Sequence, residues 1–308
     1  MPSPLPDTVA VMKGADSRTV GKACRNIASQ LREAGIETPE LDARLLVCHC
    51  CGLTHEELAA RPERSLGAAE ARELARLVRR RLDREPVSRI VGKREFHGLD
   101  FTLGPTTLDP RSDTETLVDA VIELARAGAH KSGLRILDIG TGSGCILVSL
   151  LRALPDAQGT GTDICATALA VARNNAAAHG IAPRAAFMHT RWAKGVDGGF
   201  DFVVSNPPYI PSSGIGALQP EVSRYDPHAA LDGGPDGLDA FRELASSVPP
   251  LLRPGGWLIV EVGAGQHDAV LAMFTSGQAG SIFEEFRVWK DLSGTVRCVG
   301  GKRSPTTN

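Results

Sequence analysis

The chain lacks the features of several protein classes. It has no apolar run near the roughly 18 residues of a membrane-spanning helix. Its first residues lack the basic region and apolar core of a signal peptide. A net charge of only −2 gives no general attraction to nucleic acid. We therefore expect a cytoplasmic protein that binds neither a membrane nor nucleic acid directly, and we expect it to be a monomer.

The seven cysteines are irregularly placed and odd in number, which argues against a disulfide framework and is typical of a reducing compartment. Cys48 and Cys51 have the C-x-x-C spacing of zinc ligands, but no second ligand pair follows at a suitable distance. Residues 41–51 also have the pattern of an apolar helix, in which cysteine serves as a small buried residue. We expect no metal site.

The pattern of apolar residues divides the chain. In residues 20–94 apolar side chains recur at helical spacing, which predicts a small helical bundle that we expect to bind substrate. Residues 95–110 alternate polar and apolar side chains around glycine turns, which predicts a β-hairpin linker. In residues 111–301 strands alternate with helices, which predicts an α/β domain with a mostly parallel sheet and a closing antiparallel pair. We expect residues 1–19 and 302–308 to be disordered.

A basic run at Arg79, Arg80, Arg81 and Arg84 has two interpretations. It is typical of a solvated helix face whose charges pair with nearby acids along the helix. Alternatively it forms a patch that faces an acidic protein partner. The sequence leaves both open.

A strand that ends in Asn206-Pro207-Pro208-Tyr209 is unusual. Residues 200–204 predict a buried strand, and the two prolines fix φ and remove two N–H donors, so the sheet cannot continue. The stiff turn presents the Asn206 side-chain carbonyl and backbone carbonyls beside an aromatic ring. Such a site suits a planar NH2 group, although the motif can also be a turn that only ends the strand.

A second motif joins a strand to a helix. Residues 134–139 predict a short strand, which leads through Gly140-Thr141-Gly142-Ser143-Gly144 into a helix over 145–154. The glycine spacing differs from the dinucleotide fingerprint, and no P-loop lysine follows. The next strand, over 159–162, ends in Asp163, about twenty residues along the chain after the glycines. An acid at this spacing can accept hydrogen bonds from both ribose hydroxyls of a bound nucleoside. Because ligands bind at the carboxyl ends of parallel strands, Asp138, Asp163, Trp192 and Asn206 should share one site.

Together these motifs resemble the class I S-adenosylmethionine-dependent methyltransferases, which have a Rossmann-like fold. The resemblance narrows to the release-factor glutamine methyltransferases, often called HemK or PrmC, and covers the chain from about Val20 to Gly301. The segments that carry it are residues 35–43, 96–101, 110–115, 224–227, 231–238 and 291–294 with Arg297.

The resemblance implies that the enzyme transfers a methyl group from S-adenosylmethionine to a glutamine side-chain nitrogen and leaves S-adenosylhomocysteine. The substrate would be the Gly-Gly-Gln loop of a peptide-chain release factor, a protein partner. It implies catalytic roles for Asn206, Pro207 and Tyr209, which with Pro208 would hold the substrate. It implies that the cofactor is bound by Asp138, Gly140, Thr141, Gly142, Ser143, Gly144, Asp163, Ile164, Trp192 and Asn206.

The chain departs from the family at four positions. Asp109 stands where the family usually has an apolar residue, and Ser112 where it often has proline. Arg191 replaces a small or acidic residue before Trp192, and Ala193 replaces an aromatic residue after it. Two of the four changes, Arg191 and Ala193, fall where the adenine should sit. Two other functions therefore stay open: methylation of adenine or another amine, which for duplex nucleic acid needs base flipping, and cofactor binding without activity.

Overall fold

The computed structural model describes residues 19–128, 133–275 and 282–305, which divide after Gly92 into two compact units. The boundary falls two residues before the expected end of the helical domain. Residues 1–18 and 306–308, expected to be disordered, lie outside the described residues. Thr19 is described: it caps the first helix and bridges to Ser65, so the expected lead-in ends one residue earlier.

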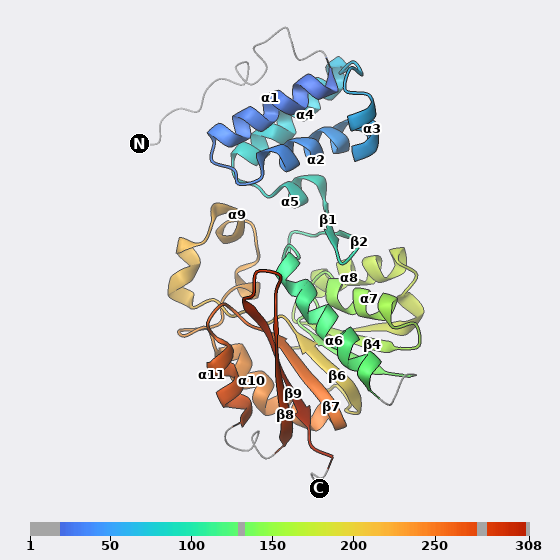
Figure 1. The fold of residues 1–308 in the computed structure, drawn as a ribbon, viewed down its shortest axis with the longest axis vertical. Helices are drawn as coiled ribbons and strands as arrows, with labels where there is room; N and C mark the ends of the chain where they lie inside the picture. The colour runs from blue at the N-terminus through green and yellow to red at the C-terminus, as the bar shows by residue number, and fades with distance from the viewer. Residues whose placement is uncertain (1–18, 129–132, 276–281, 306–308) are drawn as a thin grey trace. The chain divides into compact units, whose positions relative to one another are not determined.

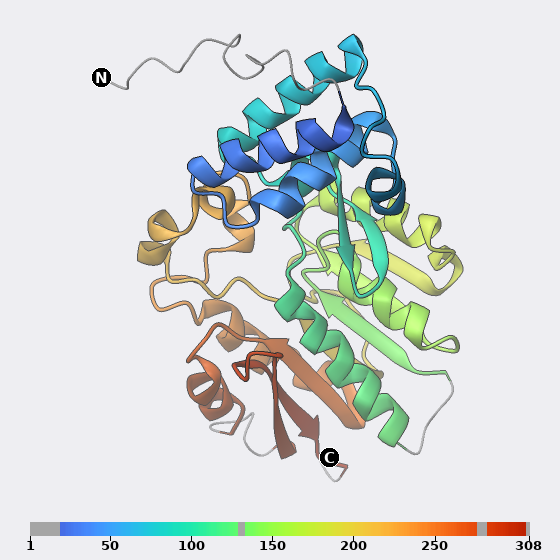
Figure 2. The same cartoon turned by 45° about the horizontal axis from the view of Figure 1, so that its top comes forward.

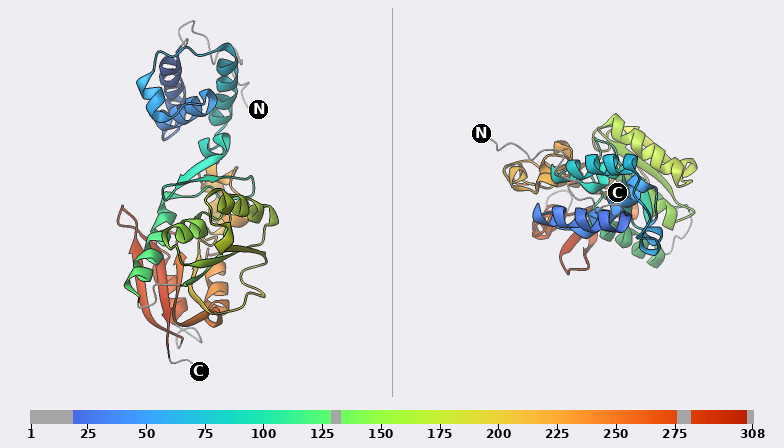
Figure 3. Two further views of the ribbon diagram at one scale, coloured as in Figure 1. Left: turned by 90° about the vertical axis from the view of Figure 1, so that its right-hand side faces the viewer. Right: turned by 90° about the horizontal axis from the view of Figure 1, so that it is seen from above.

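The first unit is an all-helical bundle, as the apolar spacing predicts (Figures 1 and 3). Pro39 opens α2 at a position where its missing N–H is harmless, and Gly52 ends α2 in the left-handed conformation. Thr54 and Glu57 form a reciprocal capping box on α3. The helices are α1 (Val20–Glu33), α2 (Pro39–Cys51), α3 (His55–Ala60), α4 (Ala68–Leu82) and α5 (Val87–Val91).

The basic run lies on α4 and just beyond it, and most of it is engaged within this unit. Arg80 Nε donates to Glu85 Oε2 at 2.7 Å. Arg81 is buried and donates from Nε to Asp42 Oδ2 at 2.6 Å, which ties α4 to α2. Arg84 donates to the carbonyl oxygens of Ala34 and Gly35. These three arginines therefore have partners within the bundle, and a role of the run in binding a protein partner stays a prediction.

The second unit begins with the predicted β-hairpin, β1 (Lys93–Phe96) and β2 (Leu99–Thr102). His97 and Gly98 both have positive φ, +51° and +73°, as a two-residue type I′ turn requires. Phe96 and Phe101 are fully buried in the core of the α/β unit. The hairpin is therefore packed into the second unit, whereas we expected a linker between the two.

A seven-stranded sheet forms the centre of this unit, in the order β5-β4-β3-β6-β7-β9-β8. All neighbours are parallel except β9, which runs antiparallel to both β7 and β8. This is the predicted Rossmann-like sheet with an antiparallel closing pair. The strands are β3 (Arg135–Ile139), β4 (Gln158–Asp163), β5 (Ala185–His189), β6 (Phe200–Ser205), β7 (Leu252–Glu261), β8 (Phe283–Lys290) and β9 (Val296–Arg303).

Helices cover both faces of the sheet (Figures 1 and 2). Side chains alternate along each strand, so Ile136 packs with α6 and α7 while Leu137 packs with α10 and α11 on the other face. The remaining helices of the unit are α6 (Glu115–Ala127), α7 (Cys145–Ala153), α8 (Ala166–Ala178), α9 (Pro220–Ser223), α10 (Asp239–Ser247) and α11 (His267–Thr275). Among the described residues, no helix has the length and apolarity needed to cross a bilayer.

Two strand boundaries differ from expectation. Residues 254–256, Pro-Gly-Gly, have the composition of a turn but lie inside β7 at an irregularity of its pairing with β6. Lys302 and Arg303, expected in a disordered tail, belong to β9, where Lys302 pairs with Trp257. In both cases strand pairing extends the element past local turn signals.

Candidate active site

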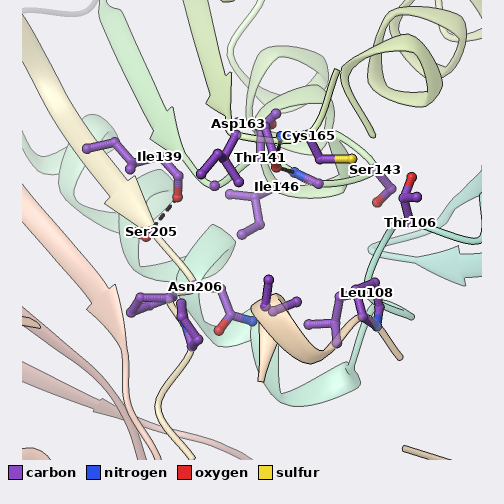
Figure 4. Close-up of a pocket in the computed structure, with 18 of the residues that line it drawn as sticks. Thr106, Leu108, Ile139, Thr141, Ser143, Ile146, Asp163, Cys165, Ser205 and Asn206 are labelled. Carbon is purple, nitrogen blue, oxygen red and sulfur yellow. Dashed lines mark hydrogen bonds between the residues drawn. The ribbon is translucent and has the colours of Figure 1, made fainter. Parts of the chain in front are cut away.

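A cavity of about 770 Å³ opens at the carboxyl ends of β3, β4 and β6 (Figure 4). The chain continues from β3 to β4 on one side and returns to β6 on the other, so this is the switch point where ligands of such sheets bind. The size is typical of a small-molecule site. Of the predicted residues, the cavity is lined by Gly140, Thr141, Gly142, Ser143, Asp163, Ile164, Trp192, Asn206, Pro207 and Pro208, and not by Asp138, Gly144 or Tyr209.

The glycine loop between β3 and α7 is held by its own neighbours. Gly140, Gly142 and Gly144 have φ of +75°, +56° and +80°, which disfavours other residues. The N–H groups of Gly140 and Thr141 both donate to the Thr162 carbonyl at 2.9 Å. A Cβ on Gly140 would meet nothing within 4 Å, so the loop presents bare backbone.

Asp138 lies beneath the loop. It is fully buried, and its Oδ2 accepts from Thr141 Oγ1 at 2.6 Å. Burial raises the pKa of Asp138 to about 7, against the opposing effect of the Thr141 hydrogen bond. In this structure Asp138 supports the loop from below and does not reach the cavity.

Asp163 does reach the cavity, at the end of β4. Its Oδ2 accepts from the Gly142 N–H at 2.9 Å and its Oδ1 accepts from the Cys165 N–H at 2.8 Å. A carboxylate oxygen has a second lone pair, so both oxygens can still accept a hydroxyl. Asp163 thus joins the loop to the start of α8 and can bind a diol from the same position.

Next to Asp163, the cavity is lined by two apolar side chains and one basic side chain. Ile164 is 59% exposed although apolar, and it lines the cavity. Trp192 lines it too, with φ of +54°, and its carbonyl accepts from Thr162 Oγ1 at 2.7 Å. Arg191 is exposed and also lines the cavity. The planar Trp192 and Arg191 side chains and the apolar Ile164 together give a wall that can pack against a planar ring.

The Asn206–Tyr209 turn depends on residues far away in the chain. Asn206 Nδ2 donates to Thr114 Oγ1 at 3.1 Å, which directs the Asn206 amide. Ser205 Oγ donates to the Ile139 carbonyl at 2.8 Å and joins the ends of β6 and β3. Gln266 Nε2 donates to the Tyr209 carbonyl at 2.9 Å. The prolines lack N–H donors of their own, and the side chains of Thr114 and Gln266, from two distant segments, hold the turn.

Tyr209 turns toward a buried acid instead of the cavity. Its hydroxyl donates to Glu261 Oε1 at 3.3 Å, and Glu261 is only 1% exposed. Burial raises the pKa of Glu261 to about 7, and burial followed by the charge of Glu261 raises the pKa of Tyr209. Sequence reasoning missed Glu261. The signal was an acid at the end of β7, directly after the apolar residues 257–260.

Two further segments that sequence reasoning did not assign to the site complete the cavity wall. Arg111 lines the cavity and donates from Nη2 to Asp226 Oδ2 at 2.6 Å, which connects the segment after the hairpin to the segment before Leu231. Other residues from these segments that line the cavity are Thr106, Leu108, Pro110, Thr114, Pro227, His228, Ala229, Ala230 and Asp232.

Comparison with known proteins identifies the family. The PrmC N-terminal domain model matches residues 22–92, and the methyltransferase small domain model matches residues 115–217. A release factor glutamine methyltransferase from Rhodospirillum rubrum is 48% identical, over 92% of this chain and 85% of that protein. The chain belongs to the release factor glutamine methyltransferase family.

A second relative belongs to the same family, and a more distant solved structure shares the fold. A release factor glutamine methyltransferase from Bradyrhizobium diazoefficiens is 45% identical, over 94% of this chain and 96% of that protein. The hMettl16 catalytic domain, solved in complex with MAT2A 3′UTR hairpin 6, covers 79% of this chain and 84% of its own. At 14% identity and a TM-score of 0.54 it shows the shared fold alone.

The structure accounts for some departures from the family pattern. Asp109 is buried with its N–H 3.4 Å from Asp226 Oδ1, and its Oδ1 is 4.0 Å from Arg94 Nε. An acid is tolerated there because a guanidinium faces it. Ala193 is buried in the core beneath Trp192, and Ser112 is exposed at the start of a short 3-10 turn. Nothing in the structure explains Arg191.

Proposed function

We propose that this methyltransferase transfers a methyl group from S-adenosylmethionine to the side-chain nitrogen of a glutamine in a peptide-chain release factor, in its Gly-Gly-Gln loop. The observation that carries the proposal is the Asn206 amide at the cavity wall. Its Nδ2 is committed to Thr114, so Oδ1 is the atom that remains to accept from a substrate NH2 group. The names of the relatives support this substrate.

The residues at the cavity fit S-adenosylmethionine. The bare glycine loop allows close approach, Asp163 can accept from the ribose hydroxyls, and Ile164 with Trp192 can hold the adenine. Gly144 has no side chain, which lets the start of α7 approach α8 closely: a Cβ there would lie 3.1 Å from the Cβ of Ala172. Asp138 holds the loop through Thr141 without touching the ligand.

S-adenosylmethionine supplies a methyl group that is already strongly electrophilic, because it is bonded to a positively charged sulfur. The chain's own residues must align the amide nitrogen, whose lone pair is delocalised into the carbonyl. Asn206 Oδ1 and the Pro207 carbonyl would each accept one N–H, which favours the pyramidal nitrogen of the transition state. Proximity and orientation can contribute about 7–11 kcal/mol.

Methyl transfer to the nitrogen balances without a metal and without a titrating base. The nitrogen forms its bond to the methyl carbon as the carbon–sulfur bond breaks, and the electron pair stays on sulfur. The nitrogen becomes far more acidic after transfer and loses its proton to solvent. Pro208 and Tyr209 stiffen the turn, and Tyr209 acts through Glu261 and Gln266 from outside the cavity.

Mass spectrometry tests the proposal directly. Incubation of the protein with S-adenosylmethionine and a release factor should add one methyl group to the glutamine of the Gly-Gly-Gln loop. A release factor with that glutamine changed to alanine is the control and should remain unmodified. Cofactor binding without any methylation, or methylation of adenine in a nucleic acid probe, would show that the proposed substrate is wrong.

We also propose that the helical unit, residues 20–92, binds the protein substrate. A short peptide with the Gly-Gly-Gln loop can reach the Asn206 turn but cannot use a second surface. The whole release factor should therefore have a much higher kcat/KM than the peptide. Equal values would remove the helical unit from substrate recognition.

A further inference from the structure

The backbone of the Asn206–Tyr209 turn is supported from behind by two segments that come later in the chain. Gln266, just before α11, donates from Nε2 to the Tyr209 carbonyl at 2.9 Å and to the Gly237 carbonyl at 3.4 Å. Its Oε1 accepts from the Gly263 N–H at 3.0 Å. Both ends of the Gln266 side-chain amide are therefore committed, and the amide joins the turn to the end of β7 and to the loop before α10.

Two glycines of that loop lie directly against the turn. A Cβ on Gly233 would lie 2.8 Å from the Pro208 carbonyl oxygen, a distance that a side chain does not tolerate. A Cβ on Gly237 would collide with the Tyr209 carbonyl oxygen. Two successive carbonyl groups of the turn thus each face a glycine, and both contacts are possible only because these positions carry no side chain.

The two prolines make the turn stiff enough to transmit this support. Each proline fixes its own φ, so few free torsions separate the Pro207 carbonyl from the Tyr209 carbonyl. At the other end of the turn, Ser205 Oγ donates to the Ile139 carbonyl at 2.8 Å. The turn is therefore held at both ends, and Pro207 between them keeps a defined position at the cavity wall.

We propose that Gly233, Gly237 and Gln266 are positioning residues for methyl transfer. The turn that they support brings the Pro207 carbonyl to the substrate amide, where a displacement of about 1 Å can lower the rate about 10²-fold. This inference rests on the proposed function, in which that carbonyl and the Asn206 side chain each accept one substrate N–H. None of the three positioning residues lines the cavity, so they act through the turn and not on the reacting atoms.

A matched pair of glycine variants tests the inference. Gly237 and Gly255 have φ of +77° and +79°, so alanine brings similar backbone strain at both positions. Only at Gly237 would the new Cβ meet the turn, since a Cβ on Gly255, within β7, would have nothing within 4 Å. In methylation of a release factor, kcat should fall about 10²-fold in Gly237→Ala and stay near the wild-type value in Gly255→Ala. Equal kcat in the two variants would overturn the inference.

A second variant tests the support without a collision or backbone strain. Gln266→Met keeps the length of the side chain but donates no hydrogen bond, so kcat should fall about 10-fold, the scale of one lost hydrogen bond. The affinity for S-adenosylmethionine, measured by calorimetry, should not change. Gln158 is exposed at the start of β4, so Gln158→Met is the control and should have normal turnover. Equal kcat in these two variants, or a loss of cofactor affinity as large as the loss in kcat, would contradict a positioning role.

Hydrogen exchange without substrate separates this inference from the proposed function. Peptides from residues 205–212 should exchange faster in Gln266→Met than in the wild type, whereas peptides from residues 139–144 should exchange alike in both proteins. If the wild type methylates no release factor but this local change is observed, the proposed function fails and the support of the turn stands. If the wild type methylates the release factor and Gln266→Met changes neither kcat nor the exchange of the turn, the inference fails and the proposed function stands.

Discussion

The glycine loop and the Asn206–Tyr209 turn form facing parts of one cavity but are held in different ways. The loop uses nearby backbone groups and two acids close in sequence, Asp138 and Asp163. The turn uses side chains from Thr114, Glu261 and Gln266, each more than 50 residues away. The glycine loop is held largely by backbone groups. The turn, whose two prolines lack N–H donors, is held by distant side chains that accept from Asn206 and Tyr209 or donate to the Tyr209 carbonyl.

The two regions also have one feature in common: each is hydrogen-bonded to a buried carboxyl group, Asp138 or Glu261, whose pKa is raised to about 7 by burial. Each acid accepts a hydrogen bond from a hydroxyl of the segment above it, Thr141 in one case and Tyr209 in the other. The comparison suggests that the loop determines cofactor affinity and the turn determines turnover. Variants that change one property without the other test this division.

The largest effect should come from the turn. Asn206→Ala removes an acceptor aimed at the transition state, so kcat should fall about 10²–10³-fold with little change in cofactor affinity. Asn206→Asp keeps an acceptor and should lose much less. Asn174 is exposed on α8, so Asn174→Ala is the matched control and should have normal turnover. Steady-state methylation and calorimetry measure the two properties. Near-normal turnover in Asn206→Ala would make the turn merely structural.

The next effect should come from the loop. Asp163→Ala removes the ribose acceptor and the bonds to Gly142 and Cys165, so S-adenosylmethionine binding should weaken by about 1.5–3 kcal/mol. Asp156 is exposed and does not line the cavity, so Asp156→Ala should bind normally. Calorimetry that finds equal affinity in both variants would remove Asp163 from the site.

The buried acids should make stability depend on pH in a defined direction. A carboxyl whose folded pKa is raised binds more protons in the folded state, so its contribution is present below the unfolded pKa near 4 and is lost as pH rises to about 7. Between pH 5 and 8 the wild type should therefore lose more stability than Glu261→Gln or Asp138→Asn, by about 2 kcal/mol each. Urea unfolding at both pH values measures this difference. An identical pH dependence in wild type and variants would contradict the raised pKa values.

The smallest effect should come from Arg191. It lines the cavity but is exposed, and a guanidinium cannot accept the hydrogens of an adenine amine. Arg191→Asp should therefore leave S-adenosylmethionine affinity unchanged or make it slightly tighter in calorimetry. Lys194→Asp, an exposed charge outside the cavity wall, controls for the change in net charge. A large loss specific to Arg191→Asp would reveal a positive role in cofactor binding.

The same contrast explains what could be predicted from the sequence. The strand, loop, helix and acid between Leu134 and Asp163 interact with one another, so their pattern alone indicated the cofactor side of the site. The turn could be recognised from its prolines, but its supports could not, because Thr114 and Glu261 reach it only through the order of strands in the sheet. We expected Tyr209 on the substrate, and the structure turns it to Glu261.

For Asp138 and the hairpin, too, the sequence predicted the local element but not the tertiary contacts of its side chains. The resemblance assigned Asp138 to the cofactor, but alternation along β3 directs it into the protein, where Thr141 holds it. The hairpin was predicted correctly from its alternation. Its burial in the second unit depends on Phe96 and Phe101 meeting a core built from later residues.

The distant supports of the Asn206 turn have a consequence for biosynthesis. Every group described around the glycine loop, from Asp138 to Trp192, has been synthesised before the ribosome reaches β6. The turn, however, lacks two of the side chains that hold it until Glu261 on β7 and then Gln266 have been added. A nascent chain halted between these points holds the parts for cofactor binding without a finished acceptor for the substrate. The ability to bind the methyl donor can thus arise before the ability to use it, because the support of the turn is complete only after Gln266 has been added.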